Sequence, residues 1–410
     1  MKFIQNRVLE NSAAMTSDVS PSVGKAMMSG LMILLMLSAV GIGNAQSIPD
    51  PLAILGEEKT EAAWKHKGRP ATLEFFRKEV YGVTPDRKVS AEWKLDRESE
   101  VFGGIAMRRE YLLILGDTLS VRVLAFVPME KGKVPAFLGL NFGGNHTVSE
   151  TSWITRTSKA PRGKSAGRWP VEMAVRKGIA MITVHCADFD PDEHDGFANG
   201  AHALFPEARD ESSWGTLGAW AWGLSRVLDH LEDVPEIDAK RVAVIGHSRL
   251  GKTALWAGAQ DERFAMVVSN NSGCGGAALS KRRQGETIAK ITSRFPHWFC
   301  SRYSKFADKE DELPMDQHQL IACIAPRPVY VASASDDAWA DPEGEFLGLK
   351  KAAPVYALFE KEPFMADKIP PADEAIGKKK MRYHLRKGKH DITRSDWGHY
   401  FAAASDLLKP

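Results

Sequence analysis

The sequence predicts a mostly parallel α/β fold, in which helices cover both faces of a central sheet. Three observations point to it. Short and nearly continuous apolar runs recur along the chain, amphipathic segments separate them, and glycine-containing turns follow several of the runs. Strands of a parallel sheet are buried on both faces, so they are expected to be apolar throughout and to be joined by crossover helices.

The elements are expected in the following order. Residues 48–89 predict a helical lead-in, with apolar residues at helical spacing over 60–82. Next come two strands that resemble an antiparallel pair, at 107–115 and 119–129. The alternation of strands and helices then begins, with strands at 134–144, 179–186, 241–246, 266–273, 327–335 and 381–388, and helices at 169–178, 213–233 and 252–262.

The first 45 residues predict a secretory signal peptide. Lys25 precedes an apolar segment that ends in the small-residue pattern Gly43, Asn44, Ala45. A membrane anchor is the alternative, because a continuous apolar run can span a bilayer, but this run is short and interrupted by glycine. We therefore expect a single domain over 46–410 that is secreted or periplasmic and is not attached to a membrane.

Composition and charge exclude several classes of partner. Hydrophobic residues make up 44% of the 410 residues and charged residues 26%, as in an ordinary globular protein. The 54 Lys and Arg against 52 Asp and Glu give a formal net charge of +2, so neither nucleic acid nor an anionic membrane is an expected partner. The protein is expected to be a monomer.

Neither a metal nor a cofactor is expected. The four cysteines show no C-x-x-C spacing and are too few for a disulfide scaffold, so buried thiols with at most one bridge are expected, at Cys186, Cys274, Cys300 and Cys323. The acidic segment "DFDPDEHDGF" at 188–197 lacks the glycine and the final glutamate of a calcium loop. We expect it to be a loop near the functional site.

The segment "VAVIGHSRLGK" at 242–252 presents a serine at the end of a strand. In such sheets catalytic groups gather at the carboxyl ends of strands, and a sharp strand-to-helix turn exposes the oxygen of Ser248. Gly246 and Gly251 would relieve the crowding of that turn. The usual motif is G-x-S-x-G, whereas this chain has G-x-S-x-x-G, so a serine that caps a helix over 249–260 is the alternative.

A base and an acid follow the serine in the order typical of this kind of hydrolase. The strand 327–335 is followed by Asp336 and Asp337, and the last strand is followed by His390 and His399. His390 comes directly after the strand, in a loop, and is the expected base, whereas His399 falls in an expected helix and has an expected structural role. The sequence does not separate the two aspartates.

These residues resemble a known family. "GHSRLGK" is similar to the G-C-S-R-x-G-K elbow of the glucuronoyl esterases, which cleave the ester between lignin alcohols and the 4-O-methylglucuronic acid of glucuronoxylan. The resemblance runs from about Pro135 to the end and includes "LNFGGNHT", "RGKSAGRWP", "SWGTLGAWAWGLSR", "NNSGCGG", "RRQGE", "HWF" and "WADPEGEF". It implies an α/β-hydrolase fold and a serine esterase that acts on glucuronoxylan or a related lignin-carbohydrate ester without a cofactor.

The resemblance also implies roles for the reacting residues. Ser248 would be the nucleophile, His390 the general base and Arg249 a donor in the oxyanion hole. Fungal members have their acid where this chain has Asn271, and an amide cannot stabilise an imidazolium as a carboxylate does. Bacterial members place the acid two residues before a tryptophan, which makes Asp337 the expected acid here.

Three further residues are expected to bind the sugar. By resemblance, Lys252 would bond sugar hydroxyls, while Glu286 and Trp339 would contact the uronate, the indole forming an apolar wall for a pyranose ring. The alternatives are a solvated helix lysine, a glutamate paired with Arg282 or Arg283, and a tryptophan that anchors the core.

Besides Asn271, the sequence departs from the fungal pattern at a second place. His247 and Asp391 stand where fungal relatives form a disulfide, so this chain lacks that covalent brace, and His247 is expected to point away from the serine oxygen. An acetyl or feruloyl esterase of the same fold is one alternative function. A catalytically silent carbohydrate-binding protein is another.

Overall fold

The computed structural model describes residues 48–130, 132–360, 364 and 366–409. The predicted signal peptide, residues 1–45, lies outside the described residues. Among the helices that are described, none combines the length and the apolar character that crossing a bilayer requires.

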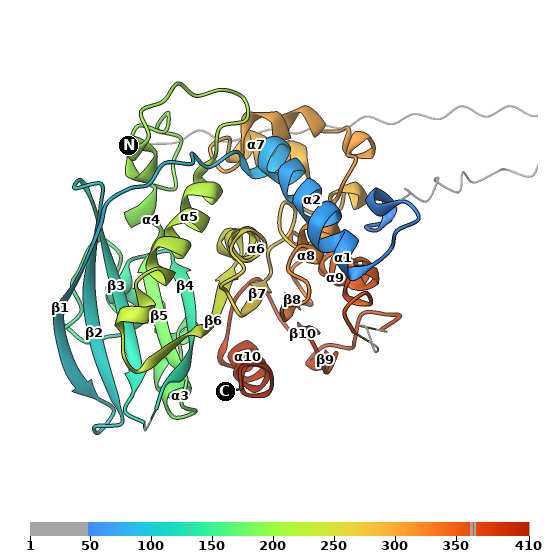
Figure 1. The fold of residues 1–410 in the computed structure, drawn as a ribbon. Coiled ribbons are helices and arrows are strands. Elements are labelled where there is room, and N and C mark those ends of the chain that lie inside the picture. Colours follow the sequence, from blue (N-terminus) through green and yellow to red (C-terminus); the bar gives the residue numbers. More distant parts are fainter. Residues whose placement is uncertain (1–47, 131, 361–363, 365, 410) are drawn as a thin grey trace, which may run out of the picture. The chain divides into compact units, whose positions relative to one another are not determined.

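The described strands form one ten-stranded sheet in the order β1-β2-β3-β5-β4-β6-β7-β8-β10-β9 (Figure 1). Neighbours from β5 to β10 in this order pair in parallel, whereas β1 to β3 are antiparallel to one another, and β3 joins the parallel part by an antiparallel pairing with β5. The predicted parallel centre is therefore confirmed. The strands are β1 (Ala91–Val101), β2 (Ala106–Leu115), β3 (Leu119–Pro128), β4 (Val134–Asn141), β5 (Ala180–His185), β6 (Ile237–His247), β7 (Met266–Asn270), β8 (Val329–Ala334), β9 (Glu374–Ile376) and β10 (Met381–Arg386).

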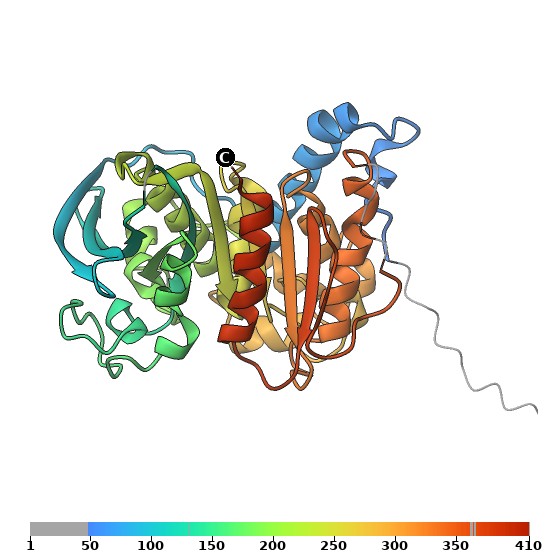
Figure 2. The ribbon, with the colours of Figure 1, turned by 90° about the horizontal axis from the view of Figure 1, so that it is seen from below.

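Helices cover both faces of the sheet (Figures 1 and 2). Helices α5, α6, α8 and α9 pack on one face, and α3 and α10 pack on the other, where α10 crosses the middle of the sheet in Figure 2. The helices are α1 (Glu61–Ala63), α2 (Arg69–Phe76), α3 (Val171–Val175), α4 (Cys186–Phe189), α5 (Thr216–Leu228), α6 (Arg249–Gln260), α7 (Ile288–Arg294), α8 (Gln317–Ala322), α9 (Pro342–Tyr356) and α10 (Arg394–Leu407).

The apolar residues 242–245 of the central strand β6 pack on both faces of the sheet. Val242 and Val244 belong to the core under α5 and α6, while Ala243 and Ile245 belong to the core under α3 and α10. Successive side chains of a strand point to opposite faces, so a strand covered on both sides must be apolar at every position. This places the end of β6, and the serine that follows it, between two packed layers.

Two strands were not predicted. The lead-in is helical over Glu61–Tyr81, partly as π-helix, but β1 then follows as the edge of the sheet. Strand β1 is exposed or half-buried along its whole length, and the alternation of Ala91, Trp93 and Leu95 with charged residues is the signal that could have revealed it. Strand β9 has three residues, too few for a periodic pattern.

All four cysteines are buried free thiols, so the described chain holds no disulfide. Burial raises the pKa of Cys274 and Cys323 to about 12 and that of Cys300 to about 11, and it also raises the pKa of Cys186. Thiols with such high pKa values are protonated and unreactive at neutral pH.

Candidate active site

Ser248 occupies a strained turn between β6 and α6. Its φ is 59° and its ψ −129°, outside the extended region that helix-capping residues adopt. Its side chain makes no capping hydrogen bond, so the alternative of a helix cap is wrong. Gly246 is required here, because a Cβ at that position would lie 1.8 Å from the carbonyl oxygen of Leu250.

His390 and Asp337 meet beside this turn. His390 Nδ1 lies 2.5 Å from Asp337 Oδ2, and the His390 ring lies against that of His247, the residue before Ser248, with centroids 4.6 Å apart. His390 and Asp337 follow neighbouring parallel strands, β10 and β8, and backbone hydrogen bonds join the two loops, such as that from Asp336 N to Gly388 O at 2.9 Å.

The environment keeps Asp337 ionised. Its side chain is 3% exposed, and Asn271 Nδ2 donates a second hydrogen bond to Asp337 Oδ2 at 2.8 Å. Burial by itself would raise the pKa of Asp337, but the hydrogen bond and electrostatic interaction with His390, together with the hydrogen bond from Asn271, hold it below its ordinary value. Asn271, which stands at the acid position of fungal relatives, therefore supports the carboxylate from the neighbouring strand.

The other candidates for acid and base lie elsewhere. Asp336 is exposed and accepts a hydrogen bond from its neighbour Ser335. His399 lies in α10 and stacks on the His384 ring at 4.5 Å. Within the described residues Ser248 Oγ makes no hydrogen bond to His390, and such catalytic contacts often tighten only when a substrate is bound.

His247 is held as a neutral imidazole. Asn270 donates to the hydroxyl of Tyr400 at 2.8 Å, so its oxygen faces His247 Nδ1 at 2.6 Å and accepts a hydrogen bond from it. Burial, together with the nearby His390 and Arg168, lowers the pKa of His247 to about 3. The ring is therefore uncharged where it contacts His390.

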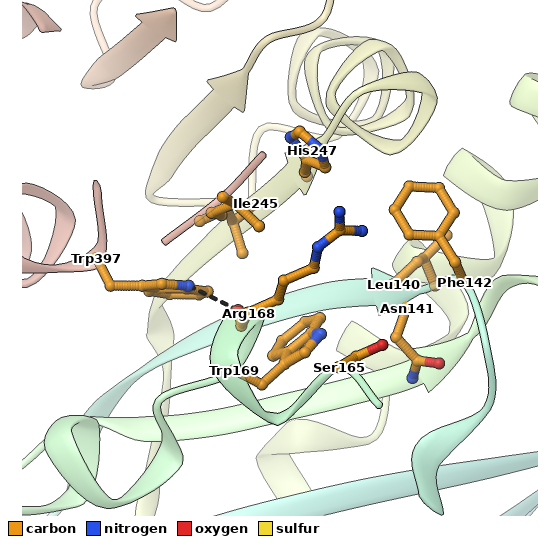
Figure 3. A pocket seen from close by; sticks show the side chains of 11 residues that line it. Leu140, Asn141, Phe142, Ser165, Arg168, Trp169, Ile245, His247 and Trp397 are labelled. Atoms are coloured by element: carbon orange, nitrogen blue, oxygen red, sulfur yellow. Dashed lines mark hydrogen bonds between the residues drawn. The ribbon is translucent and has the colours of Figure 1, made fainter. Parts of the chain in front are cut away.

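A pocket opens beside His247 on the face covered by α10 (Figure 3). Arg168 extends from its wall toward His247, forms an ion pair with Asp391 at 2.6 Å, and accepts at its backbone oxygen a hydrogen bond from Trp397 Nε1 at 2.9 Å. The cavity volume is about 20 Å³, which is room for a water molecule and not for a sugar ring. The other lining residues are Leu140, Asn141, Phe142, Ser165, Trp169, Ile245, Gly246 and Ile392.

Arg249 lies in the first turn of α6, one residue after Ser248. Its backbone N–H has no acceptor within the helix, as is general for the first helical residues. Its guanidinium forms an ion pair with Asp192 and lies 4.7 Å from the ring centroid of Trp298. Asp192 belongs to the acidic segment that the sequence placed near the site, but its contact with Arg249 was not foreseen.

Lys252, Glu286 and Trp339 form one connected group. Lys252 Nζ is buried and donates to the backbone oxygens of Ser272 and Cys274, at 2.5 and 2.7 Å, and to Glu286 Oε2 at 2.6 Å. The other carboxylate oxygen of Glu286 accepts a hydrogen bond from Trp339 Nε1 at 3.1 Å. Three acceptors saturate the ammonium group, so a sugar hydroxyl would have to replace one of them to bond Lys252.

This arrangement excludes the structural alternatives for these three residues. Lys252 is 2% exposed and is not a solvated helix residue, while Trp339 is 42% exposed and is not a core anchor. Arg282 pairs with Asp341 and Glu343, and Arg283 pairs with Glu310 and Asp311, so neither is the partner of Glu286.

A buried glutamate that the sequence did not single out holds the loop after β7. Glu345 Oε1 accepts hydrogen bonds from the backbone N–H groups of Ser272 and Gly273, at 2.5 and 3.1 Å, and Oε2 accepts one from Ser333 at 2.6 Å. Complete burial raises the pKa of Glu345 to about 8, although these hydrogen bonds lower it in part. The loop that it holds supplies Asn271 to Asp337 and two backbone oxygens to Lys252.

Comparisons with known proteins agree on one group of esterases. A family model described as "Glucuronyl esterase, fungi" matches residues 147–359. The chain is 43% identical over 385 residues to Carbohydrate esterase MZ0003 from an unknown prokaryotic organism, which is 87% of this chain and 89% of that protein.

A solved structure and a fungal relative extend the comparison. The structure titled "Glucuronoyl Esterase from Solibacter usitatus" has 37% sequence identity and a TM-score of 0.83, covering 89% of this chain and 99% of that one. The 4-O-methyl-glucuronoyl methylesterase of Phanerochaete carnosa is 31% identical over 204 residues, which is 46% of this chain and 50% of that relative.

Proposed function

The chain belongs to the glucuronoyl esterase family, and from this premise we propose that it hydrolyses the ester between (4-O-methyl-)glucuronic acid of glucuronoxylan and lignin alcohols. It is a carboxylic ester hydrolase with the α/β-hydrolase fold. The observation that carries the proposal is the contact of His390 with Asp337, at 2.5 Å, beside the strained turn of Ser248.

The proposed reaction is acyl transfer in two steps. His390 takes the proton of Ser248 Oγ as this oxygen attacks the ester carbonyl carbon, and Asp337 stabilises the imidazolium that forms. Arg249 and the backbone N–H groups of the first turn of α6 hold the oxyanion. The bond to the alcohol then breaks, and the leaving oxygen receives the proton from His390.

Water completes the cycle in the second step. His390 takes a proton from a water molecule that attacks the uronyl ester of Ser248, and it returns this proton to Ser248 Oγ when the acyl group leaves. The products are the free uronate, the alcohol and the regenerated enzyme. This cycle requires neither a metal nor a cofactor.

The acyl side of the substrate is proposed to lie against Trp339 and Glu286. The exposed indole offers an apolar face to a pyranose ring, and the Glu286 carboxylate can accept hydrogen bonds from sugar hydroxyls. The ion pair with Lys252 holds the Glu286 carboxylate in place. When the sugar binds, Lys252 Nζ releases one of its two backbone acceptors and donates to a sugar hydroxyl in its place. The family relationship and the exposed position of Trp339 support this assignment, and the predicted signal peptide supports action outside the cytoplasm.

The test compares two esters. We expect the purified mature chain to release alcohol from benzyl glucuronate with a kcat/KM well above that for 4-nitrophenyl acetate, and Ser248→Ala to abolish both activities. A clear preference for the acetate would favour the acetyl esterase alternative and would contradict the proposed sugar site. Sugar binding without turnover by the wild-type chain would favour the silent binding protein.

A further inference from the structure

The carboxylate of Asp192 accepts three hydrogen bonds at the edge of the proposed active site. Its Oδ1 accepts from Trp298 Nε1 at 2.7 Å and from His297 Nε2 at 3.1 Å, and its Oδ2 accepts from Arg249 Nη1. Burial would raise the pKa of Asp192, but these partners outweigh burial and hold the pKa below its ordinary value. The carboxylate is therefore ionised and directed at the guanidinium.

Aromatic rings enclose the same guanidinium. Its central carbon lies 4.7 Å from the ring centroid of Trp298, 5.5 Å from that of Phe295 and 5.6 Å from that of Phe142. The rings of Phe295 and Trp298 are stacked, with centroids 3.8 Å apart. Cations are attracted to such faces within about 6 Å, and a packed ring also restricts the rotamers of the side chain.

The contacts leave one edge of Arg249 available. Its Nε is buried and has no hydrogen-bond partner among the described residues, and Nη1 is taken by Asp192. The structure gives Nη2 no partner in the described part of the chain, and the side chain is 29% exposed. Asp192 thus holds one nitrogen of the guanidinium and leaves another free for a ligand.

We propose that Asp192 is a positioning residue, which fixes the guanidinium of Arg249 so that its free edge meets the oxyanion formed at Ser248. This inference rests on the proposed role of Arg249. An arginine side chain has many rotamers, and ordering it during the reaction would cost free energy that a preorganised donor avoids. The ion pair, the indole hydrogen bond and the ring contacts all fix the rotamer before the substrate arrives.

The substitution Asp192→Asn isolates this role. The asparagine oxygen keeps the two donors at Oδ1, Trp298 and His297, which leaves its NH₂ group facing Arg249 Nη1. Two donors then face each other, and Arg249 loses its anchor although the loop keeps its other contacts. Loss of a whole oxyanion donor lowers kcat by about 100-fold to 1,000-fold, so we expect a fall in kcat of about 10-fold to 100-fold with little change in KM.

Asp195→Asn is the matched control. Asp195 lies in the same loop, but its carboxylate accepts from Phe197 N and from Asn199 Nδ2, at 2.8 and 2.7 Å, and not from Arg249. We expect this variant to keep the wild-type kcat. The thermal unfolding midpoint of each variant shows whether a loss of rate follows a loss of fold.

A double-mutant cycle with Arg249→Ala separates positioning from a general structural effect. Once Arg249 is gone, Asp192→Asn is expected to change kcat by less than about twofold, because a residue that acts only through another has no effect without it. An equal fall in both backgrounds would overturn the inference, and so would an unchanged kcat in Asp192→Asn alone. A faster Asp192→Asn variant would also overturn it, because the carboxylate would then be weakening the guanidinium charge instead of placing it.

The choice of substrates keeps this inference separate from the proposed function. Each variant is assayed on benzyl glucuronate and on 4-nitrophenyl acetate, since both pass through an oxyanion. If the wild type cleaves only the acetate, the proposed uronate substrate fails, and the coupling of Asp192 with Arg249 is still measured on the acetate.

Discussion

Replacing Asp337 with asparagine tests the proposed acid and base together. The side chain keeps its size, so the packing around it should be preserved. If the amide oxygen takes the place of Oδ2, it can still accept from His390 and from Asn271, and the NH₂ group replaces Oδ1, which faces Ala340 N at 3.3 Å. In this orientation the variant loses the charge but keeps the two shorter hydrogen bonds.

The size of the effect follows from the lost charge. Opposite unit charges about 4 Å apart attract by about 4 kcal/mol at an effective dielectric constant of about 20. Asp337 is 3% exposed but His390 is 38% exposed, so water screens this attraction in part, and an effective dielectric constant of about 20 applies and not that of dry protein. At about 1.4 kcal/mol for each factor of ten, kcat should fall by about 1,000-fold, and further if the amide turns its NH₂ group toward His390 and enforces the wrong tautomer.

The assay is the release of benzyl alcohol from benzyl glucuronate at saturating substrate, with Asp336→Asn as the control. Asp336 is exposed and its carboxylate accepts a hydrogen bond from the neighbouring Ser335, so its variant should keep the wild-type kcat. If Asp337→Asn kept more than about a tenth of the wild-type rate, the loss of charge would be too small for a triad acid, and the reasoning would be refuted. A large loss in Asp336→Asn alone would transfer the role to that residue.

Three other substitutions test the surroundings of the site. Trp339→Ala removes an exposed indole without opening the core, so we expect KM for benzyl glucuronate to rise about tenfold while the thermal midpoint is unchanged. Burial raises the pKa of Glu345 from 4.5 to about 8, so the folded protein binds a proton that the unfolded chain releases, and wild-type stability should fall as the pH rises between these values. Glu345→Gln should not lose stability in this way. Between about pH 5 and about pH 9, the free energy of unfolding measured with urea should therefore fall by a few kcal/mol more in the wild type than in the variant, at about 1.4 kcal/mol per pH unit. Gly246→Ala places a Cβ 1.8 Å from the Leu250 oxygen, so it should destabilise the fold by about 3 kcal/mol in the same unfolding assay.

Each of these expectations has a result that contradicts it. An unchanged KM in Trp339→Ala would remove the indole from the sugar site. Parallel pH dependence of stability in the wild type and in Glu345→Gln would mean that Glu345 stays ionised throughout. A wild-type urea midpoint in Gly246→Ala would show that the turn before Ser248 can relax.

The parallel centre of the fold could be predicted because burial on both faces leaves a strong mark in the sequence. Residues 242–246 of β6 and nearly all of β8 are apolar, and these runs mark the two strands, although β6 begins at Ile237, before its apolar run. The edge strand β1 could not be found in this way, because only part of one face, around Trp93, packs on the core and the strand pairs only with β2. An edge strand is stabilised by a neighbour that the local sequence does not contain.

The proposed reacting residues follow more directly from the sequence pattern than the residues that support them. Ser248 and His390 follow predicted strands directly, so topology alone brings them to one edge of the sheet. The strand pattern alone left Asp336 and Asp337 equal, and only the resemblance to bacterial esterases favoured Asp337, because the choice depends on the direction of two adjacent side chains. Asp192 and Arg249 are 57 residues apart in the sequence, so no local sequence pattern predicts their contact.

The last helix carries no proposed reacting group, yet the neighbourhood of Ser248 depends on it. Tyr400 orients Asn270, which fixes the tautomer of His247, and Trp397 holds the backbone of Arg168. A protein truncated shortly after residue 393 would therefore keep Ser248, Asp337 and His390 but lose the hydrogen bonds that hold the residues around them. Among shortened copies of such genes, an intact set of reacting residues would then be a poor guide to whether the product is an enzyme.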